Sequence, residues 1–102
     1  MIPTEEISGT YLQGHITLSY KDLVKVFGEP HNSYDNHKTD VEWSFIKEIN
    51  ELDNVIFTIY NWKNGPAYLE KGKVEEITEW NIGGYDTRAL DVVMQSISMK
   101  GR

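Results

Sequence analysis

The chain has 102 residues, and its 16 acidic and 10 basic residues give a formal net charge of −6. This length fits one domain with one core, and the absence of cysteine excludes disulfides and cysteine-based zinc sites as a source of stability. A negative surface repels phosphate, so direct nucleic-acid binding is disfavoured and nucleic-acid mimicry is a minor alternative.

The chain is predicted to begin with a polar segment and a strand. Residues 1–8 show no apolar period and are expected to be flexible, whereas residues 9–97 are expected to form a single domain. Apolar and polar residues alternate over residues 12–18, which predicts a half-buried strand. Gly14 stands on the inward side of this strand, so we expect a β-bulge or the close approach of another element there.

A two-turn helix should follow this strand, and it is the best-specified element of the sequence. Ser19 occupies the N-cap position, with Asp22 three residues later in a capping-box relation. Gly28 and Pro30 end the helix. The apolar stripe at helical spacing consists of Tyr20, Leu23, Val24 and Phe27. Because so short a helix is unstable alone, it must pack on the sheet.

Three more strands are predicted with no helix between them. Alternation over residues 41–45 predicts the second strand, and the β-branched and aromatic residues of 55–62 predict the third. The third strand should be central because both of its faces are apolar. The charged residues 47–54 are expected to connect these two strands, and residues 74–82 to form the fourth. The three strands should make an antiparallel meander.

A second helix is predicted at the end of the domain. Gly83 and Gly84 are expected to break the fourth strand, and Asp86 to cap the helix. Its apolar stripe consists of Leu90, Val93, Met94 and Ile97. Residues 98–102 are expected to fray. The predicted fold is an α+β domain with two helices on an antiparallel sheet of about four strands, in the order strand, helix, strand, strand, strand, helix.

A partner-binding surface is predicted after the third strand and in the polar loop of residues 31–40. Aromatic rings beside a lysine and amides are typical of protein interfaces and of stacking pockets. The residues assigned to partner binding are Tyr60, Trp62, Lys63, Asn64, Tyr68, Tyr34 and His37. Two alternatives stay open: Trp62 lies in the core or at its rim, or it lines a cleft with Trp80 and Tyr85 that stacks a planar ligand such as a nucleobase.

Catalytic and metal-binding patterns are weak in this sequence. No cysteine nucleophile, nucleophile elbow or phosphate-binding loop is present, so we assign no catalytic residue and predict that the protein is not an enzyme. One cluster in the polar loop has the chemistry of metal ligands, and it consists of His31, Asp35, His37 and Asp40. Its spacing matches no known template, so a solvated loop without metal or cofactor is expected.

Five segments of the chain carry a resemblance to a known family. They are YLQGHI at 11–16, FGEP at 27–30, KTDVEW at 38–43, TIYNWK at 58–63 and WNIGG at 80–84. In this order they resemble a family of small, uncharacterised accessory proteins of tailed bacteriophages. The likeness extends from about residue 9 to residue 97, although the loop of residues 47–54 is longer than the turn typical of the family. The resemblance implies synthesis inside an infected bacterium, and it carries over no activity and no residue role.

These observations lead to the hypothesis of a small acidic phage accessory protein that inhibits a host protein by stoichiometric binding. The implied target is a host protein such as a component of a CRISPR or restriction defence system. A protein that sequesters a nucleotide signalling molecule is the alternative, and a nucleic-acid mimic or an enzyme is less favoured. The expected location is the bacterial cytoplasm, because no signal-peptide pattern and no apolar run of about 18 residues is present. An open sheet edge at the first or fourth strand also favours a homodimer.

Overall fold

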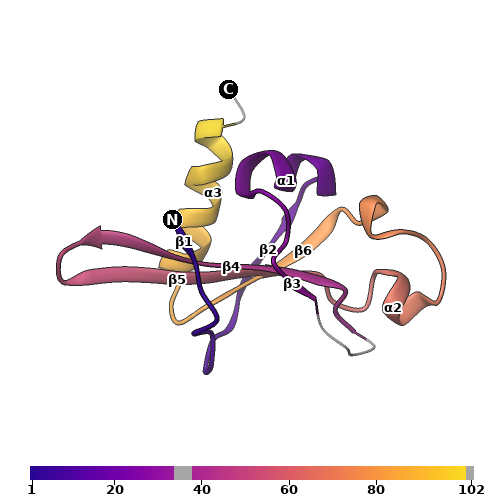
Figure 1. Ribbon diagram of the computed structural model, residues 1–102, viewed down its shortest axis with the longest axis horizontal. Coiled ribbons are helices and arrows are strands. Elements are labelled where there is room, and N and C mark those ends of the chain that lie inside the picture. The colour runs from indigo at the N-terminus through magenta and orange to yellow at the C-terminus, as the bar shows by residue number, and fades with distance from the viewer. Residues whose placement is uncertain (34–37, 101–102) are drawn as a thin grey trace.

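The computed structural model describes residues 1–33 and 38–100, and it has the predicted α+β class (Figure 1). Antiparallel strands form one sheet in the order β1-β4-β5-β6-β2, and β3 pairs with β4 beside β1. The strands are β1 (Ile2–Pro3), β2 (Tyr11–Thr17), β3 (Asn32–Ser33), β4 (Val41–Asn50), β5 (Asp53–Tyr60) and β6 (Glu79–Gly84). The helices are α1 (Tyr20–Phe27), the short α2 (Pro66–Leu69) and α3 (Arg88–Lys100), with a 3₁₀ turn, η1, at Val74–Glu76.

The predicted meander of the last three long strands is confirmed. β5 pairs with β4 on one side and with β6 on the other, so it is central as expected. Helices α1 and α3 lie on the same face of the sheet (Figure 1). Alternation along the strands points a row of large apolar side chains at these helices, and the row consists of Trp43, Phe45, Phe57, Ile59 and Ile82, all buried.

Two buried indoles hold α1 against the core. Trp43 and Trp80 meet edge to face with ring centroids 5.4 Å apart. Trp80 Nε1 donates a hydrogen bond to the carbonyl of Leu18, just before α1, at 2.9 Å. Trp43 Nε1 donates to the carbonyl of Gly28, just after α1, at 2.8 Å. Both ends of the helix are therefore fixed by side chains of the sheet, and both indole N–H groups are satisfied.

The predicted ends of α1 at Ser19 and Gly28 are confirmed. Ser19 Oγ accepts a hydrogen bond from the N–H of Asp22 at 3.1 Å, which is the N-cap contact expected from the sequence. Gly28 has φ 82° and ψ −171°, a conformation that is essentially restricted to glycine, and its N–H donates to the carbonyl of Val24 at 2.8 Å. Leu23 and Phe27 of the predicted stripe are buried, so the stripe faces the core.

The predicted connection between the second and third strands is wrong in length. β4 continues to Asn50 and β5 begins at Asp53, which leaves only residues 51–52 as the turn. The hairpin extends beyond α3 at the left of Figure 1, and Leu52 at its tip is 97% exposed. A two-stranded ribbon in solvent buries little side-chain surface, so its residues can be charged. A run of charged residues therefore does not distinguish a loop from such a ribbon.

The fourth strand also differs from its prediction. Residues 74–76 form η1, and β6 includes Gly83 and Gly84 instead of ending before them. A Cβ on Gly84 would overlap the Cβ of Ala89 in α3, and a Cβ on Gly83 would meet Thr58 Oγ1. These glycines therefore allow close packing within the strand and do not break it.

Gly14 behaves as predicted, and the structure shows both expected features. The pairing of β2 with β6 shifts register between Leu12 and Gly14, which is a β-bulge. A Cβ on Gly14 would lie 2.9 Å from Leu90 Cδ2 of α3, so the helix approaches the strand closely at this position.

The buried face of α3 differs from the predicted stripe. Val93 is fully buried, and Leu90 and Ile97 are partly buried against the core as predicted. Ala89 and Val92 are also buried there, and Met94 is 51% exposed. Ala89, the smallest residue of the helix, lies against Gly84, where a larger side chain would not fit. The helix also continues through residues 98–100, which were expected to fray, and residues 101–102 lie outside the described part.

The N-terminal segment takes part in the sheet. Residues 1–8 were expected to be flexible, yet Ile2 and Pro3 pair with Ile46 and Phe45 of β4. Among the described residues, no helix has the length and apolar character that crossing a membrane requires.

Candidate binding surface

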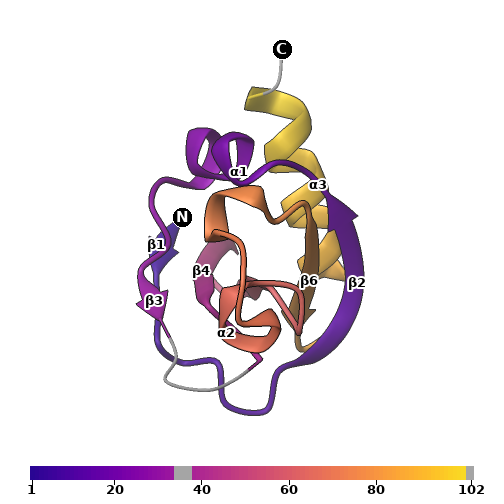
Figure 2. The same ribbon diagram turned by 90° about the vertical axis from the view of Figure 1, so that its right-hand side faces the viewer.

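The segment predicted to contact a partner forms one end of the molecule. The chain between β5 and β6 contains α2 and η1 and lies at the end opposite the β4–β5 hairpin tip (Figure 1). Figure 2 views this end directly, with α2 in front of the strands. Most side chains of this segment are at the surface, and their positions depend on the turn that carries them.

A buried hydrogen-bond network anchors this turn. Asn61 is fully buried, and its Oδ1 accepts from the N–H groups of Asp40 at 2.8 Å and Val41 at 3.1 Å. Asn61 Nδ2 donates to Asp40 Oδ2 at 2.8 Å, and Asp40 Oδ1 accepts from the N–H of Ala67 at 3.0 Å. Gly65 packs so tightly here that a Cβ would lie 2.9 Å from Asn61 Nδ2. The base of the turn is therefore well defined.

Lys63 has an unusual backbone conformation at the top of the turn. Its φ is 59°, in the left-handed region that residues other than glycine rarely adopt. Its N–H donates to the carbonyl of Lys38 at 2.8 Å, which joins this turn to the chain just before β4. The conformation turns the chain between Trp62 and Asn64 and directs the lysine side chain over neighbouring rings.

Exposed rings and lysine side chains gather around this position. Lys63 Nζ lies 6.0 Å from the ring centre of Trp62 and 5.8 Å from that of Tyr68. Lys38 Nζ lies 5.4 Å from the Trp62 ring, and Tyr60 meets Trp62 edge to face at 6.5 Å. Trp62 is 46% and Tyr68 49% exposed. We call these five residues the aromatic–lysine platform, and cation–π attraction favours this arrangement.

Four of the seven residues assigned to partner binding are thus brought together. Tyr60, Trp62, Lys63 and Tyr68 belong to the platform. A core position for Trp62 is wrong because the residue is 46% exposed, whereas a position at the rim of the core agrees with this exposure. Tyr34 and His37 lie outside the described residues. Lys38 is not among the predicted residues. It lies 25 positions before Lys63 in the sequence, and the fold brings the two together through a backbone hydrogen bond.

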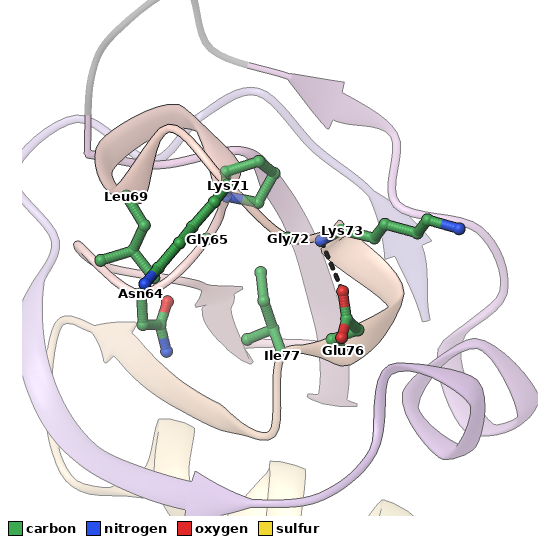
Figure 3. A pocket seen from close by; sticks show the side chains of 9 residues that line it. Asn64, Gly65, Leu69, Lys71, Gly72, Lys73, Glu76 and Ile77 are labelled. Atoms are coloured by element: carbon green, nitrogen blue, oxygen red, sulfur yellow. Dashed lines mark hydrogen bonds between the residues drawn. The ribbon is translucent and has the colours of Figure 1, made fainter.

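Asn64 lies apart from the platform and turns inward. Its Nδ2 donates to the carbonyl of Glu79 at the start of β6 at 2.8 Å. Its Oδ1 is buried and has no hydrogen-bond partner among the described residues. Asn64 lines an open pocket of about 280 Å³ between α2 and η1, where Lys71 lies across the front and Lys73 points away (Figure 3). The N–H of Lys73 donates to Glu76 Oε1 at 2.8 Å.

The alternative of an aromatic cleft is not supported by the positions of its residues. Trp80 is 1% exposed and packs in the core, so it cannot stack a ligand beside Trp62. Tyr85 follows the far end of β6, where its hydroxyl donates to the carbonyl of Ser8 at 2.7 Å. The prediction that Trp62, Trp80 and Tyr85 share a cleft is therefore wrong.

The two described members of the loop cluster with metal-ligand chemistry have structural contacts. His31 Nε2 accepts from the N–H of Ser44 at 2.9 Å, in the space that β1 and β3 leave along β4. The carboxylate of Asp40 binds Asn61 and Ala67, as described above. Asp35 and His37 lie outside residues 1–33 and 38–100, and within those residues no group of three metal-ligating side chains occurs.

The chain was compared with protein families, curated proteins and solved structures. No protein-family model, no curated protein and no solved structure matches the chain.

Proposed function

We propose that this protein acts by stoichiometric binding to a partner protein, and that the aromatic–lysine platform is its contact surface. One observation carries the proposal: Lys63 adopts a left-handed backbone conformation, and this places its ammonium group beside the rings of Trp62 and Tyr68. Such a conformation costs about 1 kcal/mol for a residue with a side chain and is characteristic of functional sites.

The composition of the platform favours a protein as the partner. Trp and Tyr supply large contact areas with few rotatable bonds, and they are enriched among the residues that dominate binding energy. The ammonium groups of Lys38 and Lys63 add positive charge at one end of a chain whose formal net charge is −6. A partner surface that combines apolar pockets with carboxylates would match this arrangement.

The proposed partner belongs to the host bacterium. A host bacterial protein, such as a component of a defence system, is proposed on the resemblance of five segments to phage accessory proteins. A protein that sequesters a nucleotide is not proposed in its place, because the cleft on which that alternative depended is not formed.

Affinity capture from bacterial lysate with a platform variant tests the proposal. The double variant Trp62→Ala, Tyr68→Ala removes both exposed rings, and neither ring lies in the core, so folding should persist. The control is Ile49→Ala, Leu52→Ala at the hairpin tip, which removes exposed apolar surface at the other end of the molecule. We expect one protein in near-stoichiometric amount with the wild type and the control, and its loss with the platform variant. Equal capture by all three, or no specific capture, would contradict the proposal.

A further inference from the structure

The outer edge of β2 has no strand paired to it among the described residues. β2 pairs with β6 on one side only, and it stands at the end of the strand order. Figure 2 shows it at the right-hand edge of the sheet, next to α3. The opposite edge differs, because β1 and β3 cover β4 with two-residue strands. The seven-residue strand β2 is therefore the place where the sheet can be extended.

The sequence of β2 lacks the charged residues and the proline that often prevent pairing at a sheet edge. It contains no lysine, proline, aspartate or glutamate, although the chain as a whole is acidic. The bulge between Leu12 and Gly14 disturbs only its first half, and residues 14–17 keep a regular register with β6. Pairing of this stretch with itself would bring together no like-charged side chains of β2, and the carboxylate of Glu79, which is bound to it, is held by Thr17 Oγ1 at 3.0 Å.

An apolar groove accompanies the open edge. It has a volume of about 240 Å³ and lies between residues 15–18 of β2 and the flank of α3. Met94 and Ile97 line it from the helix, and Met94 is 51% exposed. The apolar stripe of α3 is thus wider than its own sheet covers, and the uncovered part faces the same side as the open edge.

We propose that a second copy of this chain occupies this edge, with the two β2 strands paired antiparallel about a twofold axis. The occupant must supply an uncharged strand edge for β2 and, one layer above it, an apolar helix flank for the groove. A second copy has both in the required arrangement, because a twofold interface brings identical patches together. In the dimer, Met94 of each copy covers the groove of the other, and the two sheets become continuous.

An extended peptide is a poorer occupant on the same observations. A peptide adds one strand and satisfies the backbone groups of β2. It does not provide a second layer above the strand, so the exposed Met94 of α3 would stay in water. The groove and the edge together therefore favour a two-layered partner.

Sedimentation velocity over a dilution series tests the proposal with two variants of α3. Met94→Lys places a charge in the groove, and we expect dimerisation at least about tenfold weaker because a charge resists burial in apolar surroundings. Met99→Lys is the matched control, since Met99 is 70% exposed and lies about 140° around the helix from Met94. The control should dimerise like the wild type, and all three proteins should unfold at similar temperatures when dilute.

Hydrogen exchange supplies a second readout. Amides of residues 14–17 should exchange more slowly as the wild-type protein is concentrated, and not in Met94→Lys. A wild type that stays monomeric would overturn the proposal, even if a synthetic peptide of residues 11–17 protects the same amides. The proposal would also be overturned if both lysine variants weakened dimerisation equally, or if neither variant weakened it. Because Met94 lies far from the platform, partner capture by Met94→Lys is unaffected, and the two proposals can fail separately.

Discussion

The side chains of Asn61 and Asp40 bind each other, and each also accepts a backbone N–H: Asn61 from Asp40, and Asp40 from Ala67. Asn61 Nδ2 donates to Asp40 Oδ2 at 2.8 Å, and Asn61 Oδ1 accepts from the N–H of Asp40 at 2.8 Å. Asp40 precedes β4 and Asn61 follows β5, so the pair closes the end of the hairpin on the side of the platform. The geometry of the exposed rings depends on this buried contact.

Asn61→Ala should therefore be strongly destabilising. It removes hydrogen bonds from a fully buried site and leaves groups around Asp40 without their partner, which typically costs about 2–3 kcal/mol. Urea denaturation measures the change. Asn54→Ala, at an exposed position of β5, is the control and should alter the unfolding free energy by less than about 0.5 kcal/mol. Equal effects of the two substitutions would show that the pair does not stabilise the turn.

Gly65→Ala should destabilise the protein through steric overlap. The added Cβ would contact Asp40 Oδ2 and lie 2.8 Å from Ile77 Cδ1, so the network or the core must shift. A loss of about 2–3 kcal/mol is expected from overpacking. Gly28→Ala is the comparison without overlap, because open space surrounds Gly28. Its φ of 82° and ψ of −171° lie in a region that is essentially restricted to glycine, so backbone strain alone should cost about 1–3 kcal/mol. Thermal or urea unfolding measures both losses, and a Gly65→Ala variant as stable as the wild type would contradict the packing argument.

Substitutions of Lys63 should separate its backbone strain from its contacts. Lys63→Gly and Lys63→Ala both remove the ammonium group, but glycine accepts φ 59° freely and alanine does not. The glycine variant should be more stable than the alanine variant by about 1 kcal/mol in urea unfolding. Both should capture less partner than the wild type. Equal stabilities would argue that the turn relaxes out of the left-handed conformation.

Asp86 should make a pH-dependent contribution to the stability of the start of α3. The Arg88 side chain donates hydrogen bonds to its carboxylate, with a further bond from the Arg88 N–H, and these lower the pKa of Asp86. Because the folded-state pKa lies below the unfolded value of about 3.9, the contribution is complete above that value and is lost as pH falls through the folded-state pKa.

Asp86→Asn isolates this contribution. Its side-chain oxygen still accepts from the Arg88 N–H, but it carries no charge. The wild type should be the more stable protein at neutral pH, and the difference in urea midpoint should shrink below about pH 4 and vanish in stronger acid. In an Arg88→Gln background, the same substitution should show a smaller pH dependence. A difference that stays constant with pH would contradict the assignment.

Local signals in the sequence were sufficient for several elements. The N-cap at Ser19 and the glycine at position 28, which has a positive φ, set the ends of α1, because capping depends on residues within one turn. Periodicity predicted β2, β4 and β5, and the inward glycine at position 14 correctly indicated both a bulge and a close helix. The exposed aromatic segment after β5 was also found, since its composition differs from that of a core strand.

Other features were decided only by contacts between distant segments. The long hairpin and the glycines inside β6 were misread because their conformations depend on pairing and on Ala89 of α3. Met94 was assigned to the core because periodicity shows a stripe but not its width relative to the sheet beneath.

The sequence by itself determined the α+β class, the capped helix α1, the central strand and the acidic surface, because each follows from local pattern or composition. Tertiary structure alone decided which aromatic rings reach solvent. Trp62 and Trp80 look alike in the sequence. Trp62 lies in the turn that the Asn61–Asp40 pair anchors and reaches solvent, whereas Trp80 lies beneath α1. The physical reason is that burial depends on which segments meet in space, and those segments are far apart along the chain.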